Sequence, residues 1–232
     1  MRYYKNFFGK TPSLKQASLI NMDNIKIRPL AGADLQTITA IHSRVLPTLS
    51  AKIGTPYLRL LYETLLRDRE NHLLLVACAG RKVAGCLTAS CNLEKTQQLL
   101  ADLKFHPRLW WPVTQALLTG RLKLNELIDR LRFESFLYNS FPGPYMTILT
   151  LFVDTGYQHQ GIGPKLLDSG LRLLPQDRRL YVDTRTNNLP ARRWYEKHDF
   201  RKERVAFGNI IYVRKTQTTA KIRLNKLTSP PR

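Results

Sequence analysis

The chain of 232 residues has few acidic residues, few cysteines and no long apolar run, and each shortage excludes a class of protein. The three cysteines, Cys78, Cys86 and Cys91, form no CxxC pair and have no nearby histidines, so neither a zinc site nor a disulfide framework is expected. They are interpreted as buried thiols of a reducing compartment. No apolar run approaches the ~20 residues that span a bilayer, and the N-terminus lacks a continuous apolar stretch. These absences favour a cytoplasmic protein.

The shortage of acidic residues leaves a strongly basic chain. Only 17 Asp and Glu oppose 37 Lys and Arg, which gives a formal net charge of +20 at pH 7. Such an excess favours acidic partners, whether nucleic acid, a phosphorylated ligand or an anionic membrane. Apolar residues still make up 43% of the chain, which excludes a disordered polymer. We expect one domain with a core, flanked by basic tails.

The order of elements predicts a mixed α/β (α+β) fold. A basic leader is expected over 1–23, the domain over 24–215 and a basic, disordered tail over 216–232. Strands are expected in IKIRPL, HLLLVACAG, KVAGCLTAS, MTILTLFVD, RRLYVDT, RVAFG and IIYVRK, and helices in LQTITAIHSRVL, PYLRLLYETLLRD, PKLLDSGLRLL and PARRWYEKHDF. Asp34 is expected to cap the first helix. Residues 92–145 form a helical insertion between the third and fourth strands, predicted to cap a site, in a mixed sheet with helices on both faces.

A glycine-rich turn opens one of the predicted helices. The stretch YQHQGIGPKLL, residues 157–167, directly follows the most strand-like run of the chain. A strand that feeds such a turn aims backbone N–H groups and the positive helix end at one point, so an anion is expected there. Gly161 and Gly163 remove side chains that would block it, and Pro164 suits the first helical position. The alternative is a tight turn that needs glycine only for its φ angles.

Two motifs around this turn resemble a known family. Gln158-x-x-Gly161-x-Gly163 after LFVD, followed by Asn188-x-x-Ala191-x-x-x-Tyr195, is similar to the GNAT superfamily of acyl-CoA-dependent N-acyltransferases. The resemblance covers roughly residues 25–215 and implies a GNAT-like sheet, acetyl-CoA as acyl donor, no metal, and transfer to a primary amine by direct attack. A looser similarity to members associated with bacterial surface-polysaccharide biosynthesis implies an amino sugar or another small amine as acceptor.

The family's roles carry over to particular residues of this chain. The resemblance implies that one strand end binds the pantetheine arm through main-chain groups and that the Val153 N–H polarises the thioester carbonyl. It implies that the glycine turn binds the pyrophosphate and that Asn188 contacts the pantetheine or its adjoining loop. The implied cofactor-binding residues are Leu151, Phe152, Val153, Gln158, His159, Gln160, Gly161, Ile162, Gly163, Pro164 and Asn188.

Two residues are candidates for the proton transfers. Tyr195 is the implied acid, because an ordinary tyrosine is protonated at neutral pH and can donate to the leaving thiolate. Its alternative role is packing on an amphipathic helix beside Trp194. Asp183 is the base candidate, at the end of the strand LYVDT. An ordinary ion pair with Arg178, Arg179 or Arg185 is the competing interpretation. Glu134 and His42 are further candidates, although a lone histidine on an apolar helix is more often part of a core.

Two other functions compete with the enzyme. A nucleic-acid-binding protein could use the basic tails together with Trp110, Trp111 and Phe105, but no recognition module is present. An anionic membrane could be bound by residues 105–123 lying as an interfacial helix. Pro112 breaks that stretch, and an apolar lid over a pantetheine or acyl chain explains the same residues. The basic tails remain candidates for an anionic contact, and both a monomer and a homodimer stay open.

Overall fold

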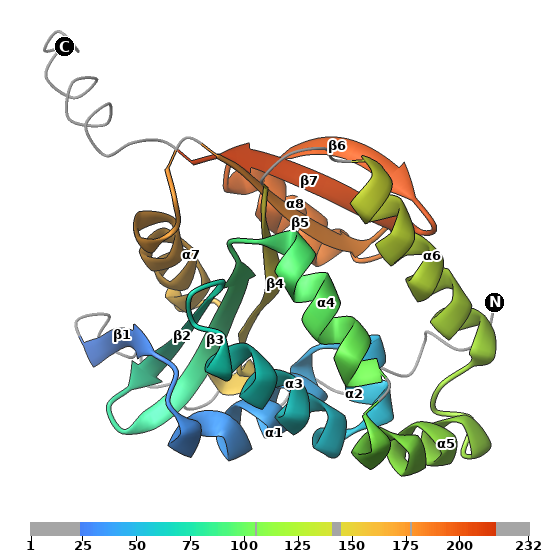
Figure 1. The fold of residues 1–232 in the computed structure, drawn as a ribbon. Coiled ribbons are helices and arrows are strands. Elements are labelled where there is room, and N and C mark those ends of the chain that lie inside the picture. Colours follow the sequence, from blue (N-terminus) through green and yellow to red (C-terminus); the bar gives the residue numbers. More distant parts are fainter. Residues whose placement is uncertain (1–23, 105, 141–144, 177, 217–232) are drawn as a thin grey trace, which may run out of the picture.

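A seven-stranded sheet forms the centre of the molecule (Figure 1). The computed structural model describes residues 24–104, 106–140, 145–176 and 178–216. The strands are β1 (Ile25–Pro29), β2 (His72–Ala79), β3 (Lys82–Ser90), β4 (Met146–Val153), β5 (Arg179–Arg185), β6 (Arg201–Ala206) and β7 (Asn209–Lys215). Their order in the sheet is β1-β2-β3-β4-β5-β7-β6, and only β4 and β5 pair in parallel. The predicted mixed sheet is confirmed.

Helices cover both faces of this sheet, as predicted (Figure 1). They are α1 (Leu35–Val45), α2 (Leu49–Ile53), α3 (Thr55–Arg67), α4 (Leu93–Lys104), α5 (Trp110–Leu118), α6 (Leu124–Ser140), α7 (Ile162–Leu173) and α8 (Leu189–Lys197). Neighbouring residues of β2 pack into different cores, on opposite faces of the sheet. Leu75 joins the core under α7 and α8, whereas Leu74 joins the core under α1 and α3. A strand buried on both faces needs a continuous apolar run, which explains the sequence HLLLVACA.

Three local predictions are corrected by the fold. Asp34 stands at the N-cap position of α1, but its carboxylate accepts two hydrogen bonds from Arg28, at 2.6 and 2.8 Å, instead of capping the helix. Pro164 is the third residue of α7 and not the first. The short helix α2 was not expected, because its five residues are too few to set a helical period.

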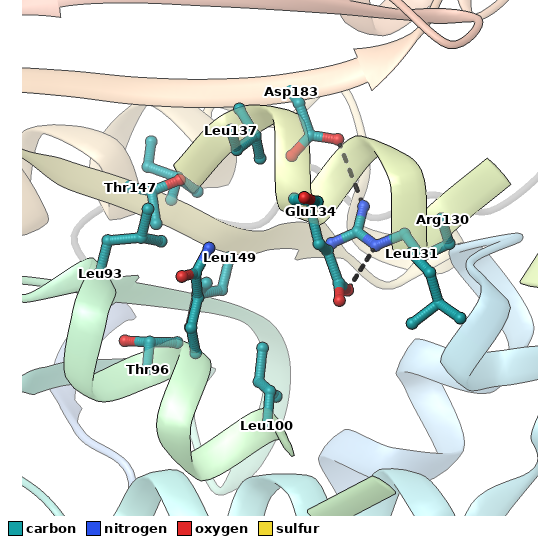
Figure 2. Close-up of a pocket in the computed structure, with 13 residues that line it drawn as sticks. Leu93, Thr96, Leu100, Arg130, Leu131, Glu134, Leu137, Thr147, Leu149 and Asp183 are labelled. Atoms are coloured by element: carbon teal, nitrogen blue, oxygen red, sulfur yellow. Dashed lines mark hydrogen bonds and ion pairs between the residues drawn. The ribbon is translucent and has the colours of Figure 1, made fainter. Parts of the chain in front are cut away.

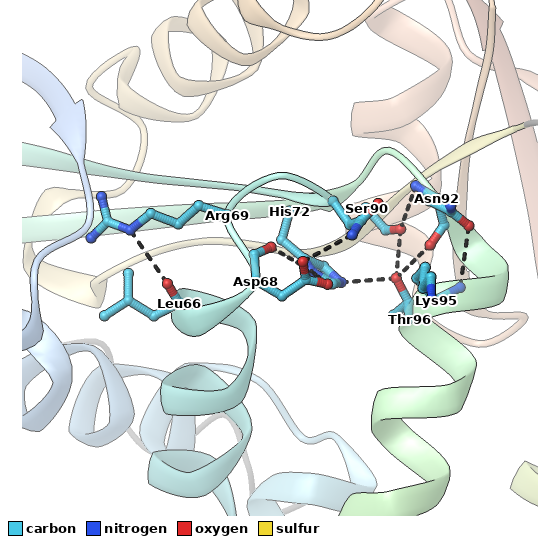
Figure 3. Close-up of polar contacts among 9 residues, drawn as sticks. Leu66, Asp68, Arg69, His72, Ser90, Asn92, Lys95 and Thr96 are labelled. Atoms are coloured by element: carbon cyan, nitrogen blue, oxygen red, sulfur yellow. Dashed lines mark hydrogen bonds and ion pairs between the residues drawn. The ribbon is translucent and has the colours of Figure 1, made fainter.

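The insertion between β3 and β4 is helical, as expected, and consists of α4, the short 3-10 turn Pro107–Leu109, α5 and α6. A buried polar cluster fixes α4 to the sheet (Figure 3). Within it, the Thr96 hydroxyl lies 2.9 Å from His72 Nε2 and donates to the Ser90 hydroxyl at 2.6 Å. The Lys52 ammonium of α2 contacts the Glu126 carboxylate of α6 at 2.6 Å. The insertion is therefore held at fixed positions over the sheet.

The predicted leader, residues 1–23, and nearly all of the predicted tail lie outside the described residues. Thr216, the first residue of that tail, is buried, and its backbone N–H donates to the carbonyl of Arg178 at 3.0 Å. Cys78 and Cys86 are buried, and Cys91 is partly buried. Within the described part of the chain, none of the helices combines the length and the apolar character needed to cross a bilayer.

Candidate active site

The parallel strands β4 and β5 separate along their length. They pair only over three positions, from Met146 opposite Leu180 to Ile148 opposite Val182. Beyond Ile148, β4 continues to Val153 and stays paired with β3 on its other side. The far half of β4 therefore has one edge that β5 does not cover, and we call the opening between the two strands the split.

The direction of the backbone groups along this edge follows from the ladder with β3. The Asp154 N–H donates to the Ala84 carbonyl at 2.8 Å, so it points toward β3. Successive residues of a strand point their N–H groups to alternate sides, which directs the Leu151 and Val153 N–H groups away from β3 and into the split. These two N–H groups are main-chain donors at the end of β4, the strand end that the family resemblance implies for binding the pantetheine arm.

The glycine turn follows at the end of this strand. Gly161, the N-cap residue of α7, has a φ of 76°, and His159 has a φ of 62°. Both lie in the left-handed region, which a glycine occupies without the strain that a side chain brings. The first N–H groups of α7 have no acceptor within the helix, so they and the positive helix end point out of the turn. The turn therefore has the geometry of an anion site, and its role in binding the pyrophosphate stays a prediction.

Two glutamines shape the turn. The Gln158 side-chain amide donates to the Val153 carbonyl at 3.0 Å, which fastens the turn to the end of β4. The Gln160 amide donates to the Gly156 carbonyl at 3.2 Å, and its buried Oε1 has no hydrogen-bond partner among the described residues. Gly163 lies against the Trp194 indole of α8. The turn, the end of β4 and α8 thus form one packed unit.

Asn188 ties α8 to the part of β5 that lies beyond its last pair with β4. The Asn188 side chain caps α8 by accepting from the Ala191 N–H at 3.4 Å, and its amide donates to the Thr184 hydroxyl of β5 at 3.1 Å. Tyr195 is 8% exposed, and burial, together with the negative charge of Asp183, raises the pKa of its hydroxyl. The hydroxyl therefore remains protonated at neutral pH.

A cavity of about 340 Å³ opens on the face of the sheet opposite α7 and α8 (Figure 2). The insertion helices α4 and α6 form its walls together with β4 and β5. Leu149 and Asp183, the first residues beyond the last β4–β5 pair, both line it. The cavity therefore reaches the point where the split begins, and helices of the insertion line it.

One arginine and two carboxylates define the polar end of the cavity. Figure 2 shows the Arg130 guanidinium of α6 between the carboxylates of Glu134 and Asp183. Its Nε donates to Glu134 at 2.9 Å, and its Nη1 lies 3.7 Å from Asp183. Burial raises the pKa of Asp183 above its usual range, and the Arg130 charge opposes that rise. A carboxyl group with a raised pKa at the edge of a cavity is suited to accept a proton.

The sequence did not identify Arg130, because nothing in α6 marks one arginine among several as facing the sheet. It expected Asp183 to pair, if at all, with Arg178, Arg179 or Arg185. The ion pair comes instead from the insertion, more than fifty positions earlier in the chain. Glu134, which the sequence offered as a further candidate, lies one helical turn from Arg130 and lines the same cavity.

His42 is a core residue. It is fully buried, with Nδ1 2.8 Å from the Tyr62 hydroxyl and Nε2 2.9 Å from the Thr48 hydroxyl. Both ring nitrogens are thus engaged, and burial lowers its pKa to about 4. The neutral imidazole joins α1 to α3 and to the start of α2, which supports the structural interpretation over the catalytic one.

This burial predicts a dependence of stability on pH. The unfolded chain gains a proton at His42 below pH 6.5, whereas the folded protein gains it only near pH 4, so stability is lost as the pH falls through this window. Between pH 7 and pH 5, His42 alone should cost about 2 kcal/mol of unfolding free energy. Urea unfolding of the wild type and of His42→Gln at both pH values measures this, because the variant should lose less. Equal losses in the two proteins would contradict the assignment.

Comparison with known proteins agrees with this geometry. The model of the acetyltransferase (GNAT) family matches residues 38–200, which run from within α1 through the glycine turn and α8. The chain belongs to the GNAT family of acetyltransferases. The resemblance in the two motifs is thereby confirmed, together with an enzyme that uses acetyl-CoA. A search of curated proteins found no match to this GNAT acetyltransferase.

Solved structures share the fold at low sequence identity. The ribosomal-protein-S18-alanine N-acetyltransferase of Escherichia coli is 16% identical, with a TM-score of 0.51 over 84% of this chain and 96% of that one. The NAA60 protein of Arabidopsis thaliana in complex with acetyl-CoA is 18% identical, with a TM-score of 0.52 over 82% and 97%. The PaiA N-acetyltransferase of Thermoplasma acidophilum in complex with coenzyme A is 15% identical, with a TM-score of 0.51 over 82% and 98%. These likenesses show the fold alone.

Proposed function

We propose that this GNAT enzyme transfers the acetyl group of acetyl-CoA to a primary amine that binds in the cavity under α4 and α6. One observation carries the proposal: the split begins where the cavity ends, at Leu149 and Asp183. A thioester held along the open edge of β4 would have its carbonyl next to that point. The amine and the thioester would meet without any movement of the sheet.

The co-substrate fits the groups on the other side of the split. The glycine turn, with Gly161 at its centre, offers N–H groups and a helix end to the pyrophosphate. The free edge from Leu151 to Val153 offers main-chain groups to the pantetheine arm. Of its two outward N–H groups, that of Leu151 is nearer to the start of the split, because Val153 lies four residues, ~13 Å, beyond Leu149. The Leu151 N–H would therefore donate to the thioester carbonyl as its oxygen gains charge. Asn188 joins the start of α8 to β5, and Tyr195 of that helix lies close enough to Asp183 to be affected by its charge. Bound there, acetyl-CoA supplies an acyl carbon activated as a thioester.

The charge of the cavity supports a cationic acceptor. Although the chain as a whole carries +20, the cavity contains two carboxylates, Glu134 and Asp183, against the single arginine Arg130. An ammonium group is attracted by such a site, whereas a phosphate is repelled. Apolar side chains form the rest of the wall, among them Leu93, Leu100, Leu131, Leu137, Ile148 and Leu149. An acceptor with some apolar surface next to its amine, an amino sugar or another small amine, fits this lining.

Two protons must move during the transfer. The ammonium first gives one proton to Asp183, directly or through one water, and the neutral amine nitrogen then forms a bond to the acyl carbon as the carbon–sulfur bond breaks. The nitrogen loses its second proton as the amide forms, and that proton replaces the one that Tyr195 gives away. Tyr195 donates its hydroxyl proton to the departing thiolate. Burial raises the pKa of both side chains. It strengthens Asp183 as a base and keeps Tyr195 in the protonated form that can donate.

The proposal is tested by the amine dependence of coenzyme A release. Purified protein is mixed with acetyl-CoA and, separately, with amino sugars, polyamines, aryl- and alkylamines and peptide N-termini, and the products are identified by mass spectrometry. We expect one class of amines to be acetylated, and Leu131→Asp, at the cavity wall, to impair that reaction more than Arg132→Asp, its exposed neighbour on α6. Acetylation that Leu131→Asp and Arg132→Asp impair equally would place the acceptor elsewhere.

The ion pair between Arg130 and Asp183 predicts how the pH dependence of kcat/KM responds to substitution. The positive charge beside Asp183 lowers the pKa of that carboxyl group, so Arg130→Gln should raise it further. Because the deprotonated carboxylate is the working base, the acidic limb of kcat/KM against pH should move upward by about one pH unit. Arg132→Gln, on the same helix and exposed, is the matched control and should leave the limb in place. An unmoved limb in Arg130→Gln would exclude Asp183 as the base.

A further inference from the structure

The helix α5 is apolar on the side that faces solvent as well as on the side that faces the protein. Trp110, Trp111 and Leu118 are 67%, 71% and 80% exposed. Trp111 and Leu118 are seven residues apart and share one helical face, with Trp110 at its margin. The remaining exposed residues of this side, Thr114 and Gln115, carry no charge. We call Trp110, Trp111 and Leu118 the α5 patch.

This exposure removes two arguments that the sequence offered against an interfacial helix. Pro112 is the third residue of α5, a position where proline is tolerated, so it does not break the helix. The tryptophans form no lid over an acyl chain, because their side chains face solvent and neither lines the cavity beside the split. The α5 patch therefore has no role in the site described above.

The patch is held in place from behind. Ala116 and Leu122 pack with Ile53 of α2 in a small core of their own, to which Val113 and Leu117 also contribute. The Lys52–Glu126 ion pair fixes α6 to α2 next to that core. Because one side of α5 is already packed, the tryptophans cannot turn inward by rotation of the helix. Figure 1 shows α5 at the periphery of the molecule, away from the sheet.

Basic residues flank the patch at both ends. Arg108 lies two residues before α5, while Arg121 and Lys123 lie three and five residues after it, and all three are exposed. The Arg121 guanidinium donates to the Thr119 hydroxyl at 3.1 Å, which keeps it at the end of the helix. The sequence from 103 to 125 contains no aspartate or glutamate. The surroundings of the patch are thus positive, within a chain whose net charge is +20.

We propose that the α5 patch docks the enzyme on an anionic phospholipid surface. Exposed tryptophan and leucine beside arginine and lysine are what an interfacial helix presents to a bilayer: the apolar side chains enter the headgroup boundary, and the cations contact lipid phosphates. Tryptophan suits this depth, since one end of its ring is apolar and the other carries an N–H. Nucleic acid fits less well, because the centre of the patch has no charge to contact a phosphate backbone. Docking requires neither acetyl-CoA nor an amine.

The experiment uses full-length protein and vesicles of phosphatidylcholine, alone or mixed with phosphatidylserine. We expect sedimentation with the mixed vesicles, a blue shift of tryptophan emission, and quenching by brominated lipid. Leu118→Ser should weaken binding about tenfold, since a buried leucine side chain contributes that much or more. Leu173→Ser is the matched control: Leu173 is 63% exposed, but it lies on α7, across the sheet. Replacing Arg121 and Lys123 by Glu should abolish the preference for anionic lipid.

Other results would overturn the proposal. Equal binding by Leu118→Ser and Leu173→Ser would show that the patch does not contact lipid. Binding that disappears when residues 217–232 are removed, yet survives Leu118→Ser, would assign the contact to the basic tail. A wild-type dimer that Leu118→Ser dissociates would make a second copy of the chain the occupant. Absence of binding to the mixed vesicles would also refute the proposal, and circular dichroism confirms that each variant is folded.

Discussion

Replacing Gly161 with aspartate is expected to abolish the binding of acetyl-CoA while the protein stays folded. The substitution adds a side chain to the centre of the turn and places a negative charge where the pyrophosphate would lie. The φ of Gly161, 76°, adds strain for any side chain, although aspartate tolerates this region better than most residues. Titration calorimetry with acetyl-CoA measures the effect directly.

The control for this experiment is Gly80→Asp. Gly80 lies in the turn between β2 and β3, also has a positive φ, 60°, and would meet no atom within 4 Å of an added Cβ. It therefore brings the same backbone strain and the same charge to a position remote from the split. Gly80→Asp should bind acetyl-CoA like the wild type. If folded Gly161→Asp retains wild-type affinity, the glycine turn is not the pyrophosphate site.

Replacing Tyr195 with phenylalanine should leave acetyl-CoA binding unchanged and slow the chemical step by ~10²–10⁴-fold, the usual contribution of a general acid. The substitution removes only the hydroxyl. Among the described residues no hydrogen bond to that hydroxyl is present, so the packing against Phe200 and Tyr212 survives. Single-turnover mixing with acetyl-CoA and a saturating amine isolates the step.

Tyr212→Phe is the matched control for Tyr195→Phe. The Tyr212 ring lies 5.8 Å from that of Tyr195, and its hydroxyl donates to the Glu196 carboxylate at 2.8 Å. Its removal costs a hydrogen bond in the same core but no proton for the thiolate, so the transfer rate should hold. If both variants keep the wild-type rate in a reaction limited by chemistry, Tyr195 is a packing residue.

Much of the fold could be predicted because its signals are local. The run HLLLVACA, the hairpin turn after it and the helical period of PKLLDSGLRLL each depend on neighbouring residues alone. The left-handed conformation of Asp199 after α8, with a φ of 64°, also follows from a local need, since the helix ends there without a glycine. The two motifs that resemble the GNAT family could be identified for the same reason, because each lies in a short stretch of neighbouring residues.

The acceptor side could not be predicted, because it depends on distant residues. Arg130 meets Asp183 only after α6 packs against β5, and no spacing in the sequence encodes that contact. Asp34 pairs with Arg28, only six residues earlier, instead of capping the helix, and this depends on how β1 and α1 lie beside each other. For Trp110 and Trp111 the sequence leaves a lid, an interfacial helix and nucleic-acid stacking open, and only the packing of α5 on α2 shows which side remains outside.

The cavity and the surface around α5 carry opposite charges, because different parts of the chain supply them. The acidic residues of the cavity come from α6 and β5, while the cations around α5 come from the segments that flank α5 in the middle of the insertion. One insertion would thus supply both the acceptor site and, through the α5 patch, the contact with lipid. The positive charge of the chain then requires no anionic acceptor.

The most direct test is a single turnover with acetyl-CoA labelled in the acetyl group, with and without the amine found in the screen. The account predicts that the label passes to the amine nitrogen, that no label stays on the protein, and that coenzyme A release without the amine is negligible. Label recovered on the protein would contradict direct attack, and label released only as acetate would contradict an amine acceptor in the cavity.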